Sequence, residues 1–465
     1  MTTLERIMAG YPRFRMKQVN KHLFHEFIGA WRESTVLPKD VIERLEKEFP
    51  INVKAETLTS KQKDTIKAIM ELSDGLSIET VLMRHGDGRN TVCVSSQAGC
   101  ALRCAFCATG MKGFNRDLSS WEMVMQVLFF ARLLKEEGER VTNVVFMGMG
   151  EPFLNYDNVL DAIRILNDKE GFDLGARNIS VSTAGIVEGI DKLSKEDIRI
   201  NLAVSLHSPN NEIRSKLMPI NRKYPIESLM EAVARYTEKT NRQVMFEYML
   251  LKDVNDSDKD AVDLARMMKD HLYVVNLISY NPTGSFKASP AKKVERFKEI
   301  LEKRGVKVTR RHSFGADIQS ACGQLSGNKK SMRELLDKLA DLELPEDGYA
   351  LYGSSPMAIR GIKEARELDV VVKDRLFDEL SAKYGNKDPD RLALEGGDIE
   401  IFPARNSLLD EPVDVIDRAE TIEGFRFVLL DDIIRWKKKM GRKKDAEHIE
   451  MIREFLERSD LKDRK

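Results

Sequence analysis

Between residues 90 and 325, short apolar and β-branched runs alternate with longer stretches of helical periodicity. The runs that predict strands are Thr91–Ser96, Thr142–Met147, Asn178–Ser182, Ile200–Leu206, Gln243–Leu250, Tyr273–Ser279 and Val306–Arg311. Alternating strands and helices are typical of βα units around a parallel sheet. We therefore predict an α/β fold built on a partial (β/α)6 barrel, with functional residues at the carboxyl ends of its strands.

The longest predicted helix covers Ser119–Glu137. Ser119, followed three residues later by Glu122, fits a capping box, in which each side chain accepts a backbone N–H of the other residue. The apolar face of this helix is predicted from Val124, Val127, Leu128, Ala131 and Leu134. A long helix between two strand runs is what a βα unit requires.

Changes in pattern divide the chain into four segments. Residues 1–85 are predicted to form a mostly helical N-terminal domain, and residues 86–328 are predicted to form the barrel. Residues 329–346 are predicted to form a linker that begins with a short helix, and residues 347–465 an α+β domain. Near the start, aromatic and basic residues interleave: Tyr11, Arg13, Phe14, Arg15, Lys17 and Lys21. That pattern fits an ordinary charged helical surface and also an accessory domain that contacts RNA.

The composition is that of soluble globular domains, because 42% of the 465 residues are apolar and 32% are charged. Since no run of 18 apolar residues occurs, we expect no membrane helix, and the first residues lack the apolar stretch of a signal peptide. The five cysteines are few and odd in number. They favour a cytoplasmic protein with chemically active thiols over a disulfide scaffold.

Charge is balanced over the whole chain but not along it. Residues 1–344 carry an excess of five basic residues, and 345–465 an excess of five acidic ones. Binding to nucleic acid would therefore need a local patch. One candidate is the cluster Lys307, Arg310, Arg311 and His312, which fits either a phosphate contact or a solvated strand edge. Because coiled-coil heptads are lacking, we expect a monomer.

Three cysteines, Cys100, Cys104 and Cys107, follow the first predicted strand closely enough to converge on one metal centre. A structural zinc ion needs four protein ligands. An iron–sulfur cubane held by three thiolates leaves one iron open for a small molecule. The spacing favours the cubane, with a zinc site and a chance grouping of structural cysteines as the alternatives.

This spacing in a βα barrel resembles the radical S-adenosylmethionine (SAM) superfamily. Longer motifs resemble the RlmN/Cfr family of RNA adenine methyltransferases over residues 10–325: 93–110, Val145–Pro152, Val181–Gly185, Ser205–His207, Leu217–Asn221 and Ala321–Leu325. The resemblance implies a 4Fe–4S cluster on Cys100, Cys104 and Cys107, and SAM on its open iron. An electron from the cluster would cleave SAM to a 5′-deoxyadenosyl radical.

The same resemblance implies a set of SAM contacts. Gly150 and Glu151 match residues at the SAM amino end, where a glycine lets the backbone approach and a carboxylate suits an ammonium group. The further matched contacts are Ser182, Ser205, Leu206, His207 and Asn281. Taken alone, His207 would be interpreted as a structural histidine.

The resemblance also implies roles for the other two cysteines and one acid. Cys322 matches the cysteine that is first methylated and then attacks the adenine ring as a methylene radical, which forms a protein–RNA adduct. Cys93 matches the cysteine that releases the product and leaves a disulfide bond, and Glu79 matches the proton acceptor. The chemistry is consistent, because a ring C–H of adenine is not acidic and its carbon is not nucleophilic. Radical addition therefore needs a thiolate, a resolving thiol and a base.

The implied substrate is an adenosine of 23S rRNA, methylated at C2, with adenosine 37 of tRNA as a second target; the alternative is C8, as in Cfr-type enzymes. The reacting base must be unstacked to reach the pocket. A small electron donor such as flavodoxin or ferredoxin is expected. A non-enzymatic zinc-binding RNA module is the competing class, separated by iron and sulfide content.

The C-terminal segment resembles the minimal nucleotidyltransferase fold. The resemblance is carried by Gly353-Ser354, by Glu367 and Asp369 on one strand face, and by Glu400 on a later strand. It implies nucleotide phosphates at the Gly-Ser turn and two metal ions on the carboxylates. An active transferase, an inactive binding domain and an unrelated α+β domain are the alternatives, and the second would make the chain a regulatory fusion.

Overall fold

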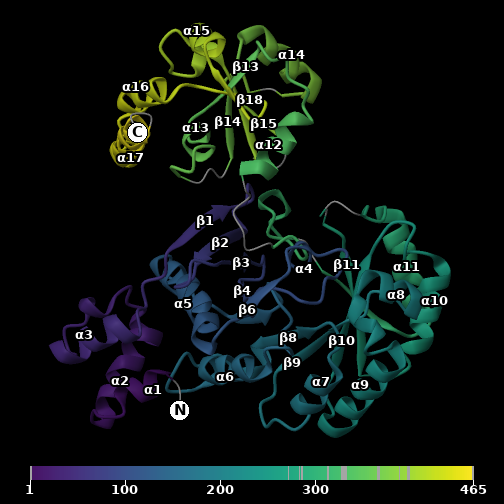
Figure 1. Ribbon diagram of the computed structural model, residues 1–465. Coiled ribbons are helices and arrows are strands. Elements are labelled where there is room, and N and C mark those ends of the chain that lie inside the picture. Colours follow the sequence, from purple (N-terminus) through teal and green to yellow (C-terminus); the bar gives the residue numbers. More distant parts are fainter. Residues whose placement is uncertain are drawn as a thin grey trace. The chain divides into compact units, whose positions relative to one another are not determined.

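The computed structural model describes residues 3–462 except 271, 282, 284, 285, 312, 313, 326–331, 364–366, 387 and 395–397. The chain forms two compact units, Met1–Gly327 and Asn328–Lys465 (Figure 1). Over the described residues, no helix combines the length and the apolar character needed to span a bilayer.

A ten-stranded sheet in the order β1-β2-β3-β4-β7-β8-β9-β10-β11-β12 forms the centre of the first unit. Neighbours from β4 to β12 are parallel. These strands are β4 (Asn90–Cys93), β7 (Asn143–Phe146), β8 (Ile179–Thr183), β9 (Asn201–Ser205), β10 (Val244–Leu250), β11 (Tyr273–Ser279) and β12 (Lys307–Arg311). Each of the seven predicted runs overlaps one of them, so the predicted barrel strands are confirmed.

Helices connect the parallel strands, and their apolar faces pack with the strands into one core. They are α5 (Ser120–Glu136), α6 (Tyr156–Asn167), α7 (Val187–Leu193), α9 (Ile226–Thr240), α10 (Asp258–Met267) and α11 (Ala291–Glu302). The capping box predicted at Ser119 and Glu122 is present at the start of α5. Short helices α4 (Ala108–Met111) and α8 (Asn211–Leu217) lie in the loops at the carboxyl ends of the strands.

The prediction that residues 1–85 are mostly helical is wrong for its second half. The helical part is α1 (Thr3–Met8), α2 (Arg13–Lys21), the turns η1 (His22–Glu26) and η2 (Trp31–Glu33), and α3 (Lys39–Glu48). Strands β1 (Ala55–Thr59), β2 (Thr65–Glu71) and β3 (Ser77–Arg84) follow and extend the main sheet antiparallel to β4. The strand pattern was hidden because these strands bury charged residues, among them Lys67 and Glu79.

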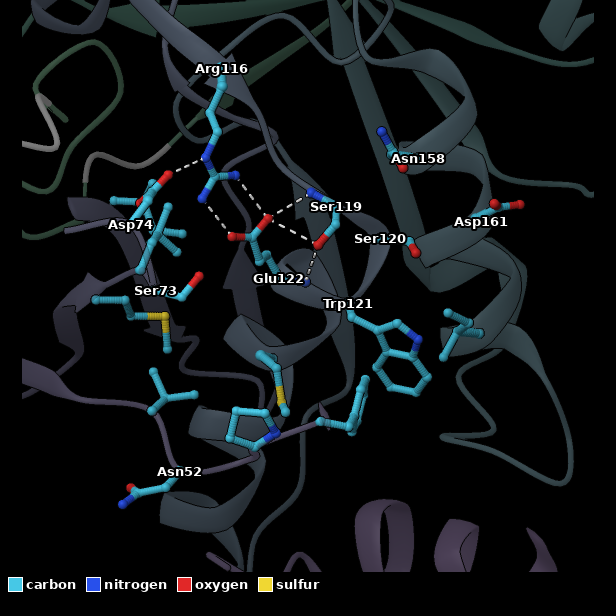
Figure 2. A pocket seen from close by; sticks show the side chains of 18 of the residues that line it. Asn52, Ser73, Asp74, Arg116, Ser119, Ser120, Trp121, Glu122, Asn158 and Asp161 are labelled. Carbon is cyan, nitrogen blue, oxygen red and sulfur yellow. Dashed lines mark hydrogen bonds and ion pairs between the residues drawn. The ribbon is translucent and has the colours of Figure 1, made fainter. Parts of the chain in front are cut away.

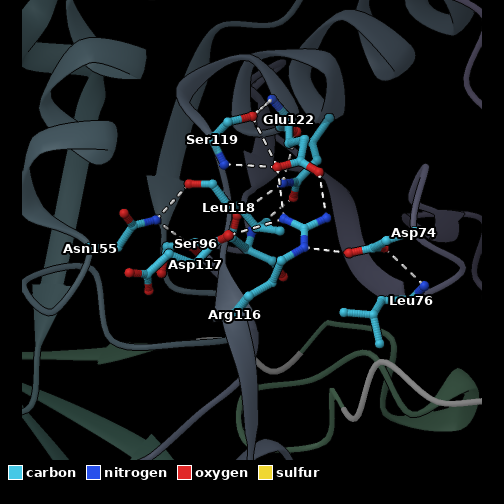
Figure 3. Close-up of polar contacts among 11 residues, drawn as sticks. Asp74, Leu76, Ser96, Arg116, Asp117, Leu118, Ser119, Glu122 and Asn155 are labelled. Carbon is cyan, nitrogen blue, oxygen red and sulfur yellow. Dashed lines mark hydrogen bonds and ion pairs between the residues drawn. The ribbon is translucent and has the colours of Figure 1, made fainter.

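A polar cluster ties the β2–β3 turn to the start of α5 (Figure 3). Arg116 lies on β6 (Phe114–Asp117), which pairs with β5 (Gln97–Gly99). Its guanidinium donates two hydrogen bonds to the Glu122 carboxylate, at 2.7 and 3.0 Å, and a third to Asp74. Glu122 also accepts the Ser119 backbone N–H at 2.8 Å. The cluster therefore anchors the helix end that follows the cysteine loop.

The second unit is the predicted α+β domain. Its sheet has the order β15-β16-β14-β13-β18-β17, with β13 (Tyr349–Tyr352), β14 (Leu368–Val372), β15 (Leu392–Leu394), β16 (Ile399–Pro403), β17 (Glu420–Ile422) and β18 (Phe425–Phe427). The helices are α12 (Met332–Ala340), α13 (Ser355–Ala358), α14 (Asp374–Tyr384), α15 (Pro412–Asp417), α16 (Leu430–Met440) and α17 (Lys443–Lys462).

The predicted linker 329–346 is part of this second unit rather than a free connection. Its helix α12 was expected, but Leu335, Leu336 and Leu339 are buried in the core of the unit with the strands β13 to β16. Three leucines on one helical face bury too much apolar surface to be left in water. The boundary between the two units therefore lies before α12.

Candidate active site

A cavity of about 170 Å³ lies at the carboxyl ends of the barrel strands. Eleven of the thirteen predicted site residues line it: Cys93, Cys100, Cys104, Cys107, Gly150, Glu151, Ser182, Ser205, His207, Asn281 and Cys322. Glu79 and Leu206 do not. The sequence motifs, spread over more than 200 residues of chain, are thus brought together in one place.

The three clustered cysteines stand on the loop between β5 and α4. Burial raises the pKa of the Cys100 thiol to about 12 and that of Cys104 well above its usual value. Thiols in such a place become thiolates readily only when a metal compensates the lost hydration. Among the described residues, no three metal-binding side chains surround a single ion position. A cubane takes each thiolate on a different iron, so this donor set fits a 4Fe–4S cluster.

Gly150 and Glu151 form the loop after β7. Gly150 has φ +99°, and a Cβ there would lie 2.5 Å from Cβ of Gln97. The Glu151 carboxylate accepts the backbone N–H groups of Phe153 at 3.0 Å and Ala184 at 2.7 Å. Burial still raises the pKa of Glu151 to about 7. The carboxylate thus joins two adjacent strand-end loops in the cavity wall.

His207 is a neutral imidazole in the cavity wall. Its Nδ1 accepts the backbone N–H of Met249 at 3.0 Å, which leaves the proton on Nε2. Burial, together with the charge of Arg214, lowers its pKa to about 3. Leu206 is buried away from the cavity, and its N–H donates to the Glu247 carbonyl at 3.0 Å. Leu206 can therefore contribute only its backbone and packing.

Glu247, on β10, is a charged site residue that the sequence motifs did not identify. Its carboxylate accepts the Ser182 hydroxyl at 2.8 Å and the Ser205 hydroxyl at 3.5 Å, and pairs with Arg311 at 3.3 Å. These partners come from β8, β9 and β12. The only sequence signal is a carboxylate inside the apolar run 244–251, where an acid is costly unless it is paired.

The basic cluster predicted near β12 divides between two faces. Arg311 points into the cavity, where it contacts Glu247 and the Met147 sulfur, both at 3.3 Å. Arg310 lies outside and pairs with the exposed Glu295 at 3.0 Å. His312 is outside the described residues. Arg311 is therefore part of the site and not of a surface phosphate patch.

Cys93 and Cys322 face the same cavity as reduced thiols. Cys93 ends β4, and burial raises its pKa to about 12. The Cys322 loop is held against the cysteine loop by a hydrogen bond from the Ala108 N–H to the Gly323 carbonyl at 2.8 Å. Asn281 donates to the Cys322 carbonyl at 3.4 Å.

Glu79 lies on β3, just beyond the cavity wall. It is buried and pairs with Lys67 at 3.7 Å. The Lys67 ammonium also donates to the Gln319 carbonyl at 3.3 Å, so Glu79 is linked to the loop that carries Cys322. By strand alternation Glu79 shares a face with Val81, which does line the cavity.

A second, larger cavity of about 1680 Å³ lies between the N-terminal helical segment and the helices α5 and α6 (Figure 2). Its polar lining includes Asp74, Arg116, Glu122 and Asp161, and it contains none of the predicted site residues. Acidic side chains predominate in this lining, which disfavours a polyanion. The candidate chemistry therefore belongs to the smaller cavity.

Comparisons with known proteins agree with this location. Residues 94–265 match the Radical SAM superfamily. The chain is 44% identical to "Probable dual-specificity RNA methyltransferase RlmN" of Dictyoglomus thermophilum, over 68% of this chain and 91% of that protein. It is 45% identical to "Ribosomal RNA large subunit methyltransferase N" of Nitrosopumilus maritimus, over 69% and 94%. A crystal structure of a radical SAM methyltransferase from Sphaerobacter thermophilus is 44% identical, with a TM-score of 0.68 over 70% of this chain and 98% of that one.

Proposed function

The chain belongs to the RlmN family of radical SAM RNA methyltransferases, and on this premise we propose that it methylates C2 of an adenosine in 23S rRNA. Adenosine 37 of tRNA is the second target that we propose, since one of the relatives is named as dual-specific. The observation that carries the proposal is the position of Cys93 and Cys322. Both thiols share one cavity with the three clustered cysteines.

The cluster and SAM, when bound, would supply the methyl group and the radical, and the cluster would take back the one electron that remains on the adduct when the ring proton leaves. The residues of the chain do the rest. Cys322 receives the methyl group on its sulfur and carries the carbon to the adenine ring, and Glu79 takes the ring proton. The Cys93 thiolate then attacks the Cys322 sulfur: an S–S bond forms and the S–C bond breaks. Its electron pair passes to the carbon, which takes a proton and becomes the new methyl group.

The remaining cavity residues are proposed to hold SAM. The Nε2–H of His207 is a neutral donor, and the Glu151 carboxylate fixes the loops on which Gly150 and Ala184 lie. Ser182 and Ser205 are oriented by Glu247. Hydroxyl groups held at strand ends in this way suit a polar ligand with several donors and acceptors.

We propose that the N-terminal helical segment contacts RNA. Phe14 on α2 is 53% exposed, and the Arg15 guanidinium lies over its ring at 4.7 Å. An exposed aromatic ring beside cationic side chains suits stacking on unpaired bases together with phosphate contacts.

The product of the reaction tests the proposal. We would reconstitute the cluster anaerobically, add SAM, a reductant and an unmethylated 23S rRNA fragment, and identify the nucleosides by mass spectrometry. 2-Methyladenosine is the expected product, and 8-methyladenosine would move the protein to C8 chemistry. SAM cleavage without either product would contradict this rRNA target and direct the assay to tRNA. Retained methylation by Cys322→Ala would overturn the role of Cys322.

For the second unit, the register of its sheet favours a separate nucleotide-binding role. Asp369 on β14 and Glu400 on β16 are direct neighbours, and a Cβ at Gly353 would lie 1.9 Å from the Asp369 carboxylate. The Gly-Ser turn and two acids therefore meet, as the nucleotidyltransferase resemblance implies. Titration with Mg·ATP and Mg·GTP by calorimetry should show binding that Asp369→Asn abolishes. Unaltered binding by this variant would contradict the site.

A further inference from the structure

Arg311 lies in the candidate active site, although no motif assigned it a role. Its guanidinium contacts Glu247 on β10 and Met147 after β7, both at 3.3 Å. In the sheet order, β8 to β11 separate β7 from β12. Arg311 therefore reaches across the mouth of the curved sheet, and 20% of its side chain is exposed.

The cavity offers this cation little compensation. Among the described residues that line it, Arg311 carries the only permanent positive charge. His207 is neutral, and the Glu151 carboxylate is engaged by two backbone N–H groups. The charge of Glu247 is shared between Arg311 and the hydroxyls of Ser182 and Ser205. A guanidinium in this setting favours a further anion close by.

Two of the thiols that line the cavity, those of Cys322 and Cys93, interact electrostatically with Arg311. Charge on Cys322 raises the pKa of Arg311 more than charge on Glu247 or Cys93 does. Arg311 also acts on Cys93. Burial and the charge of Cys322 raise the pKa of Cys93, whereas the charge of Arg311 lowers it. Glu79 and its partner Lys67 are not among the residues that line the cavity, and Lys67 is hydrogen-bonded to the loop that carries Cys322.

We propose that Arg311 is a positioning residue that stabilises the thiolate of Cys322 and, once that sulfur carries a carbon, the thiolate of Cys93. This inference rests on the proposed function of the two thiols. A thioether sulfur bears no negative charge. Once Cys322 is methylated, the Arg311 guanidinium therefore stabilises the thiolate of the second nucleophile, Cys93. One fixed cation thus serves two thiolates in the order in which the reaction needs them.

Alkylation tests the proposal without RNA or turnover. The full-length protein with its cluster is treated anaerobically with iodoacetamide between pH 6 and 10, so that a cysteine S–C bond forms and iodide leaves. Peptide mass spectrometry reports Cys322 and Cys93 separately. Arg311→Gln should slow the labelling of Cys322 at pH 7 about tenfold, because the cation that favours its thiolate is removed.

Two matched variants define the effect. Arg311→Lys keeps the charge and should label Cys322 within about twofold of the wild-type rate, whereas Arg311→Gln should not. Arg310→Gln removes the neighbouring surface charge, which pairs with Glu295, and should leave both thiols unchanged. Cluster absorbance and the melting temperature confirm that each variant is folded and loaded.

A second measurement tests the proposal even if the Arg311→Gln variant does not fold. In Cys322→Ala the competing thiolate is absent, so Cys93 should alkylate faster than in the wild type. No gain at Cys93 in Cys322→Ala would overturn the proposal, as would equal labelling of Cys322 in the wild type and in a folded Arg311→Gln variant. If the protein methylates RNA but Arg311→Gln does not change the labelling, only this inference is rejected. If Arg311→Gln changes the labelling but the protein does not methylate RNA, only the proposed function is rejected.

Discussion

At the scale of single residues, Gly150 satisfies two constraints that another residue could meet only with strain. Its φ is +99°, and an added Cβ would approach within 2.5 Å of Gln97. Gly150→Ala should therefore destabilise the first unit and loosen the loop that carries Glu151. Gly138→Ala is the matched control, because Gly138 also has positive φ but has no atom within 4 Å of an added Cβ. The control should cost only the backbone strain, about 1–2 kcal/mol.

Scanning calorimetry measures this difference. The first-unit transition should fall further in Gly150→Ala than in Gly138→Ala, and cluster loading should drop only in the former. Equal shifts in the two variants would show that the contact with Gln97 relaxes without cost.

The second residue-scale prediction concerns Asp369. Burial, and then the charges of Glu367 and Glu400, raise its pKa from 3.8 to about 7. Below pH 3.8 the carboxyl is protonated in both states; above it, the folded state holds the proton more tightly than the unfolded state. The protonated carboxyl contributes to the stability of the folded unit. This contribution is fully present below pH 3.8 and is lost as pH rises through about 7, where the folded unit must bury a charge. Asp369→Asn should therefore stabilise the second unit more at pH 8 than at pH 5, by a few kcal/mol.

The melting temperature of the second unit at the two pH values checks this prediction. Asp378→Asn is the control, because it removes an exposed carboxylate that pairs with Arg405 at the surface. A constant difference between Asp369→Asn and the wild type from pH 5 to 8 would show that Asp369 does not bury a charge as the pH rises.

Sequence motifs identified the cysteines of the candidate site but not most of the charges around them. Cysteines are few, and their spacing carries chemical information by itself. Glu247, Arg311 and Lys67 are common residue types, and their importance comes from burial and from partners distant in sequence. Those partners exist only after the strands are arranged side by side, so the sequence alone could not predict them.

At the scale of secondary-structure elements, the start of α5 is stabilised by a capping hydrogen bond that a single substitution can remove. The Ser119 hydroxyl accepts the Glu122 N–H, and Glu122 in turn binds Arg116 (Figure 3). Ser119→Ala should cost about 1 kcal/mol of first-unit stability, because one helix N–H loses its acceptor. Ser120→Ala is the control, since that hydroxyl is not part of the capping box. Urea unfolding in a Trp436→Phe background, where Trp31 and Trp121 report, measures both; equal costs would contradict the cap.

The elements themselves were predictable where burial is uniform. Strands such as β10 and β11 are buried on both faces and appear as apolar runs, which is typical of parallel sheets, whereas the edge strand β12 is largely exposed. Strands β1 to β3 alternate apolar with charged positions, and some of those charges are buried, as Glu79 and Lys67 show. A charged residue every few positions also fits a helix with a solvated face, so the pattern alone could not separate the two.

At the scale of the whole chain, the two units have separate cores, and the second unit begins at Asn328 rather than at the predicted residue 347. Helix α12 contributes Leu335, Leu336 and Leu339 to the second core. A chain that ends at Gly327 should stay soluble and keep the methylation activity proposed above, because every residue predicted for the methylation site precedes this cut. A chain that ends at Leu344 would expose the three leucines and should aggregate more readily.

Light scattering at equal concentration, together with methylation rates, compares the two truncated chains. Leu335→Glu in the longer one supplies the control, because a charge on the exposed apolar face should restore solubility. Equal solubility of the two chains would place α12 outside the second core. Loss of methylation only in the chain ending at Gly327 would instead show that the first unit needs α12, and the boundary between catalysis and its extension would then lie later in the chain.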